Sequence, residues 1–185
     1  LYAIAGGNKA RRCRFLHDRV QQAAHSLLDE ASQQRAHLTI ARWLLATSHA
    51  PFVPERLFQI AEQFSAGQAL IDDPEEGRRV AAIHLQAARR AIQASAYKSA
   101  HQFALAAHVL LQPADWERDY VLQSELHQTL AVAEYLTGNL ARSKELIMAA
   151  IGRLRTAIEK AELFNQVLAN AGGATSNALT GATPL

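Results

Sequence analysis

Small side chains recur at a constant spacing in the second half of this 185-residue chain. Four positions match four others that each lie 43 residues later: Ala88, Tyr97, Ala100 and Ala107 correspond to Ala131, Leu140, Ser143 and Ala150. Small residues let two helices cross closely, and a larger residue can pack into the turn between them. The spacing therefore predicts stacked helical hairpins with these residues as packing positions. The alternative interpretation is an ordinary alanine-rich helical bundle in which the offset arises by chance.

Apolar residues follow helical spacing along almost the whole chain. We expect a helix from residue 18, another capped by Ser32, a third from near residue 55, and further helices over residues 72–94, 97–111, 113–138, 140–155 and 157–170. Nothing sharply separates the last two of these helices. Because no segment shows sustained alternation with a period of two, a sheet of any size is not expected. The sequence therefore predicts an all-α fold.

The clearest helix start is the acidic stretch around Pro74. The pair Asp72-Asp73 offers a cap, Pro74 suits the first turn, and Glu75 and Glu76 place negative charge where the helix dipole favours it. Gly138 is a favourable stop signal for the C-terminus of the longest predicted helix, over residues 113–138. These signals set the expected borders of the repeat.

Composition and charge exclude several classes of function. The formal net charge is +2 and basic residues are not confined to one stripe, which argues against nucleic-acid binding. Cys13 is the single cysteine, so the chain alone can build neither a disulfide framework nor a cysteine zinc site. A reducing compartment fits this usage, and we expect a cytoplasmic location. No apolar run approaches the roughly 20 residues that a membrane span needs.

Sequence motifs for catalysis are absent from the chain. It has no G-x-x-x-x-G-K-[ST] loop, no G-x-G-x-x-G and no H-E-x-x-H. His101 and His108 lie on one helical face but two turns apart, too far to share a metal ion without other ligands. Trp43 and Trp116 are expected to pack in the core rather than form a ligand cage. We therefore expect no catalytic residue, no metal and no cofactor within this chain.

The second copy of the repeat resembles a tetratricopeptide repeat. Gly138 and Leu140 match the turn of that family, while Ser143 stands where alanine is usual. The first copy has Ser95 in place of the turn glycine, and the step of 43 exceeds the usual 34. The resemblance covers residues 74–155. It implies a right-handed superhelix of tetratricopeptide-like hairpins whose surface binds a protein or peptide.

A second resemblance is carried by residues 15–27, which begin Phe-Leu-His-Asp-Arg-Val. This stretch is similar to one in large bacterial sensor kinases, of the serine/threonine or histidine type, where it closes a winged-helix segment behind an AAA-like ATPase of the STAND class. Residues 71–76 and 133–139 fit the same family, while His25 stands where it usually has tyrosine. The resemblance covers about residues 15–155 and implies a short winged-helix remnant followed by helical repeats.

The same resemblance implies a nucleotide-sensing role for His17, with Asp18 and Arg19 beside it. An imidazole N–H can donate to a phosphate oxygen of bound ADP, and Asp18 can cap the following helix. The alternative is that His17 packs the junction between strand and helix. ATP or ADP is expected in the parent protein, and its upstream ATPase domain and kinase module are the expected partners.

We predict a non-catalytic regulatory and protein-interaction segment that couples the nucleotide state of an upstream ATPase domain to contacts on helical repeats. Residues 1–50 are expected to hold the end of the winged-helix segment and one helix, residues 51–171 the repeats, and residues 172–185 a disordered tail of small residues. The alternatives are a stand-alone helical-repeat adaptor and a part of a LuxR-like ATPase transcriptional regulator. A C-terminal helix-turn-helix would distinguish the latter.

Overall fold

The computed structural model describes residues 28–49, 51–112, 115–165 and 169, and the secondary structure of these residues is helical, with no strands. The helices are α2 (Glu30–Ala46), α3 (Pro54–Gly67), the 3-10 turn η1 (Gln68–Leu70), α4 (Pro74–Gln93), α5 (Tyr97–Leu110), α6 (Asp115–Arg118), α7 (Tyr120–Leu136) and α8 (Leu140–Ile151). Residues 157–165 are also helical. The predicted all-α class is confirmed for this part of the chain. None of its helices is both long and apolar enough to cross a bilayer.

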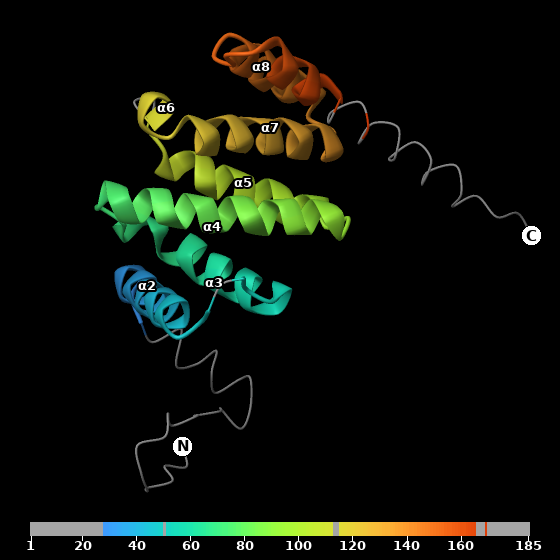
Figure 1. The fold of residues 1–185 in the computed structure, drawn as a ribbon. Helices are drawn as coiled ribbons and strands as arrows, with labels where there is room; N and C mark the ends of the chain where they lie inside the picture. The colour runs from blue at the N-terminus through green and yellow to red at the C-terminus, as the bar shows by residue number, and fades with distance from the viewer. Residues whose placement is uncertain (1–27, 50, 113–114, 166–168, 170–185) are drawn as a thin grey trace, which may run out of the picture.

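Within the described residues, three helical hairpins stack one on another (Figure 1). They are α2–α3, α4–α5 and α7–α8, with the short α6 beside the start of α7. The second helix of each hairpin packs on the first helix of the next, as α3 does on α4 and α5 on α7. The second helices begin at Pro54, Tyr97 and Leu140, so both steps are 43 residues long. The stack therefore repeats in the chain with a fixed period.

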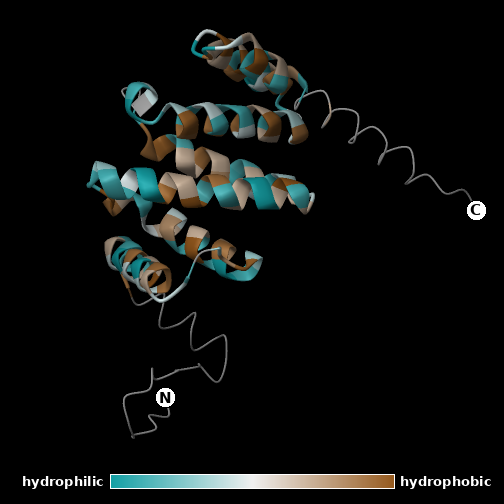
Figure 2. Cartoon of the chain, viewed as in Figure 1, coloured by the Kyte–Doolittle hydropathy of each residue, from teal (hydrophilic) through white to brown (hydrophobic). Residues whose placement is uncertain are grey.

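Alanine fills much of the core that joins the hairpins. The largest buried cluster runs from α2 to α8 and includes Ala61, Ala88, Ala104 and Ala131, all fully buried. Apolar residues are interleaved with hydrophilic ones along the helices, which gives each helix a face to bury (Figure 2). Because alanine side chains are short, the helix axes can approach closely without leaving cavities.

Gly67 allows α3 to approach α2 closely. A Cβ atom at this position would lie 2.8 Å from both the Cβ and the backbone N of Leu38, and 2.9 Å from the carbonyl oxygen of Gln34. Two of these three atoms belong to the α2 backbone, which cannot rotate away. The end of α3 can therefore rest on α2 only if residue 67 has no side chain.

Local capping explains where two helices begin. Asp73 accepts hydrogen bonds from the backbone N–H groups of Glu75 and Glu76, and Pro74 occupies the first turn, which confirms the predicted start of α4. The predicted cap of α2 at Ser32 was wrong. Asp29 caps this helix, and the N–H of Ser32 donates to its Oδ1 at 2.7 Å. An acid just before a helix satisfies its free N–H groups and also favours its dipole.

Two predicted helices in the second half are divided differently. The prediction of one long helix over residues 113–138 is wrong, because α6 and α7 are separate helices. Asp119 lies between them with φ −139°, which is not a helical conformation. The helix predicted over residues 140–155 ends at Ile151. The next begins after Thr156, whose Oγ1 accepts from the N–H of Glu159 while Oε2 of Glu159 accepts from the N–H of Thr156. This is a capping box.

The remaining N- and C-terminal predictions fall on other residues. The winged-helix remnant, with His17, Asp18 and Arg19, and the tail over residues 172–185 lie outside the described residues. They stay predictions, as do the domain borders.

Candidate functional site

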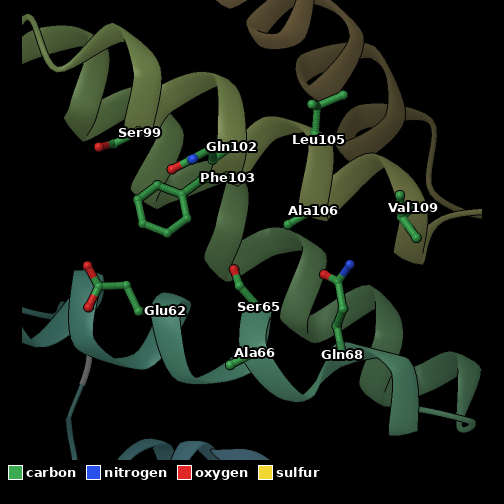
Figure 3. Close-up of a pocket in the computed structure, with 10 residues that line it drawn as sticks. All are labelled: Glu62, Ser65, Ala66, Gln68, Ser99, Gln102, Phe103, Leu105, Ala106 and Val109. Atoms are coloured by element: carbon green, nitrogen blue, oxygen red, sulfur yellow. The ribbon is translucent and has the colours of Figure 1, made fainter. Parts of the chain in front are cut away.

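A groove lies between α3 and α5, with η1 at one end (Figure 3). Its volume is about 560 Å³, within the range of about 300–1,000 Å³ typical of ligand pockets. Residues of α3 and η1 form one wall and residues of α5 form the other: Glu62, Ser65, Ala66 and Gln68 on the first, and Ser99, Gln102, Phe103, Leu105, Ala106 and Val109 on the second.

The α5 wall supplies the apolar part of the groove. Figure 3 shows Phe103 reaching from α5 into the space between the two helices. This ring is buried and stacks on Phe58 of α3, with 5.9 Å between ring centroids. The side chain of Leu105 is 38 % exposed and that of Val109 is 70 % exposed, and both values are high for branched apolar side chains. The groove therefore offers unburied apolar surface beside a fixed aromatic floor.

Two polar groups on the opposite wall lack partners in the described part of the chain. The carboxylate of Glu62 is exposed and forms no ion pair or hydrogen bond there. The side-chain oxygen Oε1 of Gln68 is buried without any donor. A buried acceptor without a partner costs about 1–3 kcal/mol, a penalty that the protein carries at this end of the groove.

Ser65, on the α3 wall of the groove, forms a hydrogen bond with a buried histidine of α4. Ser65 Oγ lies 2.8 Å from Nε2 of His84, and Nδ1 of His84 lies 3.0 Å from the carbonyl oxygen of Val80. Because a carbonyl only accepts, Nδ1 carries the proton and Nε2 accepts from the Ser65 hydroxyl. Burial lowers the pKa of His84 to about 4, against the weaker opposing effect of the Val80 bond. Such an imidazole is a poor base near neutral pH, so the pair seals the α3–α4 interface instead of activating a nucleophile.

Most of the predicted packing positions lie where helices cross. Those fully or almost fully buried are Ala88, Ala100, Ala107, Ala131, Ser143 and Ala150. Ser143 donates from Oγ to the carbonyl oxygen of Ala131 at 2.8 Å, a bond that an alanine there could not make. Gly138 has φ +88° in the turn between α7 and α8. Tyr97 is only partly buried, and Leu140 is 59 % exposed.

The remaining histidine and tryptophan predictions concern a metal site and core packing. His101 lies 3.1 Å through Nε2 from Oε1 of the buried Glu134, which also accepts from Asn139 at 2.8 Å. The described residues contain no cluster of three or more groups that could hold a metal ion. Trp116 is buried, as predicted, whereas the same prediction for Trp43 was wrong, since its side chain is 56 % exposed on α2.

Comparison with known proteins gives one partial similarity. The chain is 24 % identical over 168 residues to hybrid signal transduction histidine kinase G of Dictyostelium discoideum. The match covers 78 % of this chain, and the chain spans about 5 % of the length of that relative. No protein-family model matches the chain. No solved structure matches it either.

Sequence reasoning missed the groove. Leu105 and Val109, four residues apart, would lie on one face of the predicted helix over residues 97–111, and that spacing was the available signal. The opposite wall comes from residues 62–68, which face α5 only after the hairpins stack. The predicted nucleotide-sensing residues His17, Asp18 and Arg19 belong to the undescribed N-terminal region.

Proposed function

We propose that this chain is a non-catalytic protein-interaction segment of a signalling protein and that its α3–α5 groove binds a peptide. The occupant is a short segment that carries apolar side chains next to a basic one. The observation that supports this most directly is the pairing of exposed Leu105 and Val109 with the unpaired carboxylate of Glu62 across one open groove. Apolar anchors supply affinity, and the carboxylate selects for a cation.

The fixed repeat of the hairpins supports this proposal. Stacked helical hairpins form extended surfaces in repeat proteins, and a peptide can lie along such a surface. We propose that the three hairpins are tetratricopeptide-like, with a period of 43 residues between their second helices. The similarity to a signal transduction histidine kinase supports a signalling-related role. We place the segment in the cytoplasm of the cell.

The proposal also includes the upstream coupling that the sequence resemblance implies. In this arrangement an ATPase domain of the same polypeptide binds ATP or ADP, and His17 with Asp18 and Arg19 contacts the nucleotide phosphate at a winged-helix segment. Nucleotide exchange then changes how the hairpins are presented to their partner and to a kinase module.

A peptide-display selection with the 185-residue chain tests the groove. We expect enriched peptides to combine apolar residues with lysine or arginine. Val109→Asp, which puts a charge on the apolar wall, should lower their affinity at least about tenfold. Met148→Asp is the matched control, because Met148 is a similarly exposed apolar residue on α8, away from the groove. It should leave binding unchanged.

Charge reversal gives the sharper test. With Glu62→Lys, the same selection should enrich acidic peptides in place of basic ones, since the groove would then carry the opposite charge. If the two selections return the same peptides, or if Val109→Asp and Met148→Asp weaken binding equally, the groove is not the binding site.

The upstream coupling has an independent test in the longer protein. His17→Ala should weaken ADP retention while peptide binding to the groove stays the same. Unchanged ADP affinity would remove nucleotide sensing from the proposal and leave the interaction role standing.

A further inference from the structure

A second pocket, of about 320 Å³, lies at the C-terminal end of α5, between α6, α7 and the chain that follows α8. It is separate from the α3–α5 groove and shares no lining residue with it. Its walls combine aromatic, basic, amide and aliphatic side chains: His108, Leu111, Gln112, Trp116, Gln123, His127, Ala149 and Arg153. Among the described residues that line it, the titratable ones are two histidines and an arginine, and none is an acid.

The guanidinium of Arg153 has no carboxylate partner among the described residues. It lies over the ring of Trp116, 5.5 Å from the ring centroid, and its backbone N–H donates to Ala150. An arginine carries five N–H donors in a planar fork that suits a carboxylate or a phosphate. In this pocket the fork is left available to a ligand from outside the chain.

His127 presents a fixed nitrogen to the same pocket. Its Nδ1 lies 2.8 Å from the carbonyl oxygen of Gln123, so Nδ1 carries a proton and Nε2 is the nitrogen left for a ligand. Gln123 is itself held in place, because its Nε2 donates to the carbonyl oxygen of Gln112 at 3.1 Å. Trp116 packs against the His127 ring at 4.9 Å between centroids and limits its rotation.

Basic side chains lie near His127 on α5 and on the chain that follows α8. His108 on α5 meets it edge to face with 5.3 Å between ring centroids, and Arg153 approaches from the chain after α8. The charge of Arg142 on α8 helps to lower the pKa of His108, and Arg142 itself forms an ion pair with Glu145. Burial is the main cause that lowers the pKa values of both histidines. The Gln123 bond opposes this shift at His127, while the charges of His108 and Arg153 add to it. An anion placed among these groups would stabilise the protonated forms of the two histidines.

We propose that this pocket binds a small anionic ligand whose phosphate or carboxylate group is held by Arg153 and His127 and whose apolar part lies on Trp116 and Leu111. This site goes beyond the proposed peptide groove and does not depend on it. Binding favours the protonated form of His127, because the imidazolium then donates from Nε2 to the anion. Affinity therefore rises as pH falls.

Histidine NMR signals of the 185-residue chain provide the readout. The signals of the two rings are assigned with His108→Gln and His127→Gln. Phenyl phosphate, benzoate and the uncharged benzyl alcohol are then titrated in. We expect saturable shifts at both rings with at least one anion and none with the alcohol. The tighter of the two anions identifies the group as phosphate or carboxylate.

The variants separate a built site from general attraction to a basic surface. Arg153→Gln should weaken the tighter anion at least about tenfold, because a charge-assisted pair is lost. Arg155→Gln is the matched control, since Arg155 lies two residues away and stacks on Tyr120 at 4.1 Å instead of lining the pocket. It should change the affinity by less than about twofold.

The pH comparison uses benzoate, whose charge is the same at about pH 6 and about pH 8. Affinity should be higher at the lower pH, and His127→Gln should abolish this difference while the protein stays folded by circular dichroism. Absence of any saturable shift, equal weakening by Arg153→Gln and Arg155→Gln, or a pH effect that survives His127→Gln would each overturn the proposal.

Discussion

The two interfaces between successive hairpins use equivalent positions but treat their histidines differently. His84 in α4 and His127 in α7 are 43 residues apart, and each bonds through Nδ1 to the backbone carbonyl four residues earlier, at 3.0 and 2.8 Å. The residues across from them, Ser65 and His108, are also 43 residues apart. At the first interface Ser65 bonds to Nε2 of His84, whereas at the second the two imidazoles meet with no hydrogen bond between them.

This difference shows how one position controls whether an interface is sealed. A hydroxyl is small and satisfies Nε2 of His84, so that ring is fully buried. A second imidazole at the place of Ser65 leaves Nε2 of His127 open to a pocket. The same backbone arrangement therefore yields a closed structural contact at one step of the repeat and a candidate ligand site at the next.

The largest expected effect is acid destabilisation through His84. Its pKa falls from 6.5 to about 4 on folding, so the unfolded chain binds more protons between these values. Its contribution is complete above about pH 6.5 and is lost as pH falls toward 4, up to about 3 kcal/mol. Urea unfolding across this range should show the loss in the wild type.

Two variants decide whether His84 is the source. His84→Gln should flatten the pH dependence of the unfolding free energy, leaving the smaller contributions of His108 and His127, whose pKa values are also lowered. His49→Gln should retain the wild-type slope, because His49 is exposed. An unchanged slope in His84→Gln would show that the sealed interface does not exclude a proton.

The next effect concerns the residues opposite the two histidines. Ser65→Ala leaves the buried Nε2 of His84 without its donor and should cost about 1–3 kcal/mol in unfolding free energy near neutral pH. His108→Ala breaks no hydrogen bond and should cost less. It should also raise the pKa of His127, since one neighbouring positive charge is removed. If His108→Ala costs more than Ser65→Ala, hydrogen bonding does not distinguish the interfaces.

The helical repeat could be predicted from the sequence, but the pockets that the stacked hairpins form could not. Two sequence patterns predicted parts of the fold. The small residues at a constant offset indicated where the hairpins cross, and the acids around Pro74 indicated the start of α4. The capping box at Thr156 and Glu159 was also readable, since the pattern T-x-x-E is local, and it was overlooked.

The two pockets could not be predicted in the same way. Each is formed by side chains from helices that become neighbours only when the hairpins stack. The offset does relate His84 to His127, but the sequence does not say which ring is buried. Burial depends on Ser65 and His108, whose contacts across the interfaces are tertiary.

The turns of the last two hairpins offer a smaller comparison. Ser95 and Gly138 occupy equivalent positions and both have positive φ, +58° and +88°. Gly138→Ala should cost about 1 kcal/mol from backbone strain alone, because a Cβ there meets nothing within 4 Å. Ser95→Gly should gain about 0.5 kcal/mol, since the freedom of glycine in the unfolded chain offsets part of the relief. Thermal unfolding of both variants measures this, and effects of equal sign would contradict it.

The smallest expected effects come from the ion pairs that link the first helices of the hairpins. Arg42 on α2 donates through Nε and Nη2 to both carboxylate oxygens of Glu76 on α4 at 2.7 Å, and this bonding lowers the pKa of Glu76. Arg89 on α4 reaches Glu125 on α7 at 3.1 Å with both side chains well exposed. Arg42→Gln should cost about 0.5–1 kcal/mol and Arg89→Gln less than about 0.5 kcal/mol in low salt.

Salt and pH separate these two pairs further. Because the folded pKa of Glu76 is lowered, its contribution is present above its ordinary pKa of 4.5 and is lost as pH falls below it. High salt should remove most of the cost of Arg89→Gln but only part of that of Arg42→Gln, since the Glu76 side chain is 17 % exposed. Equal costs that salt screens equally would mean that the two steps of the stack differ in their histidine contacts and not in their charges.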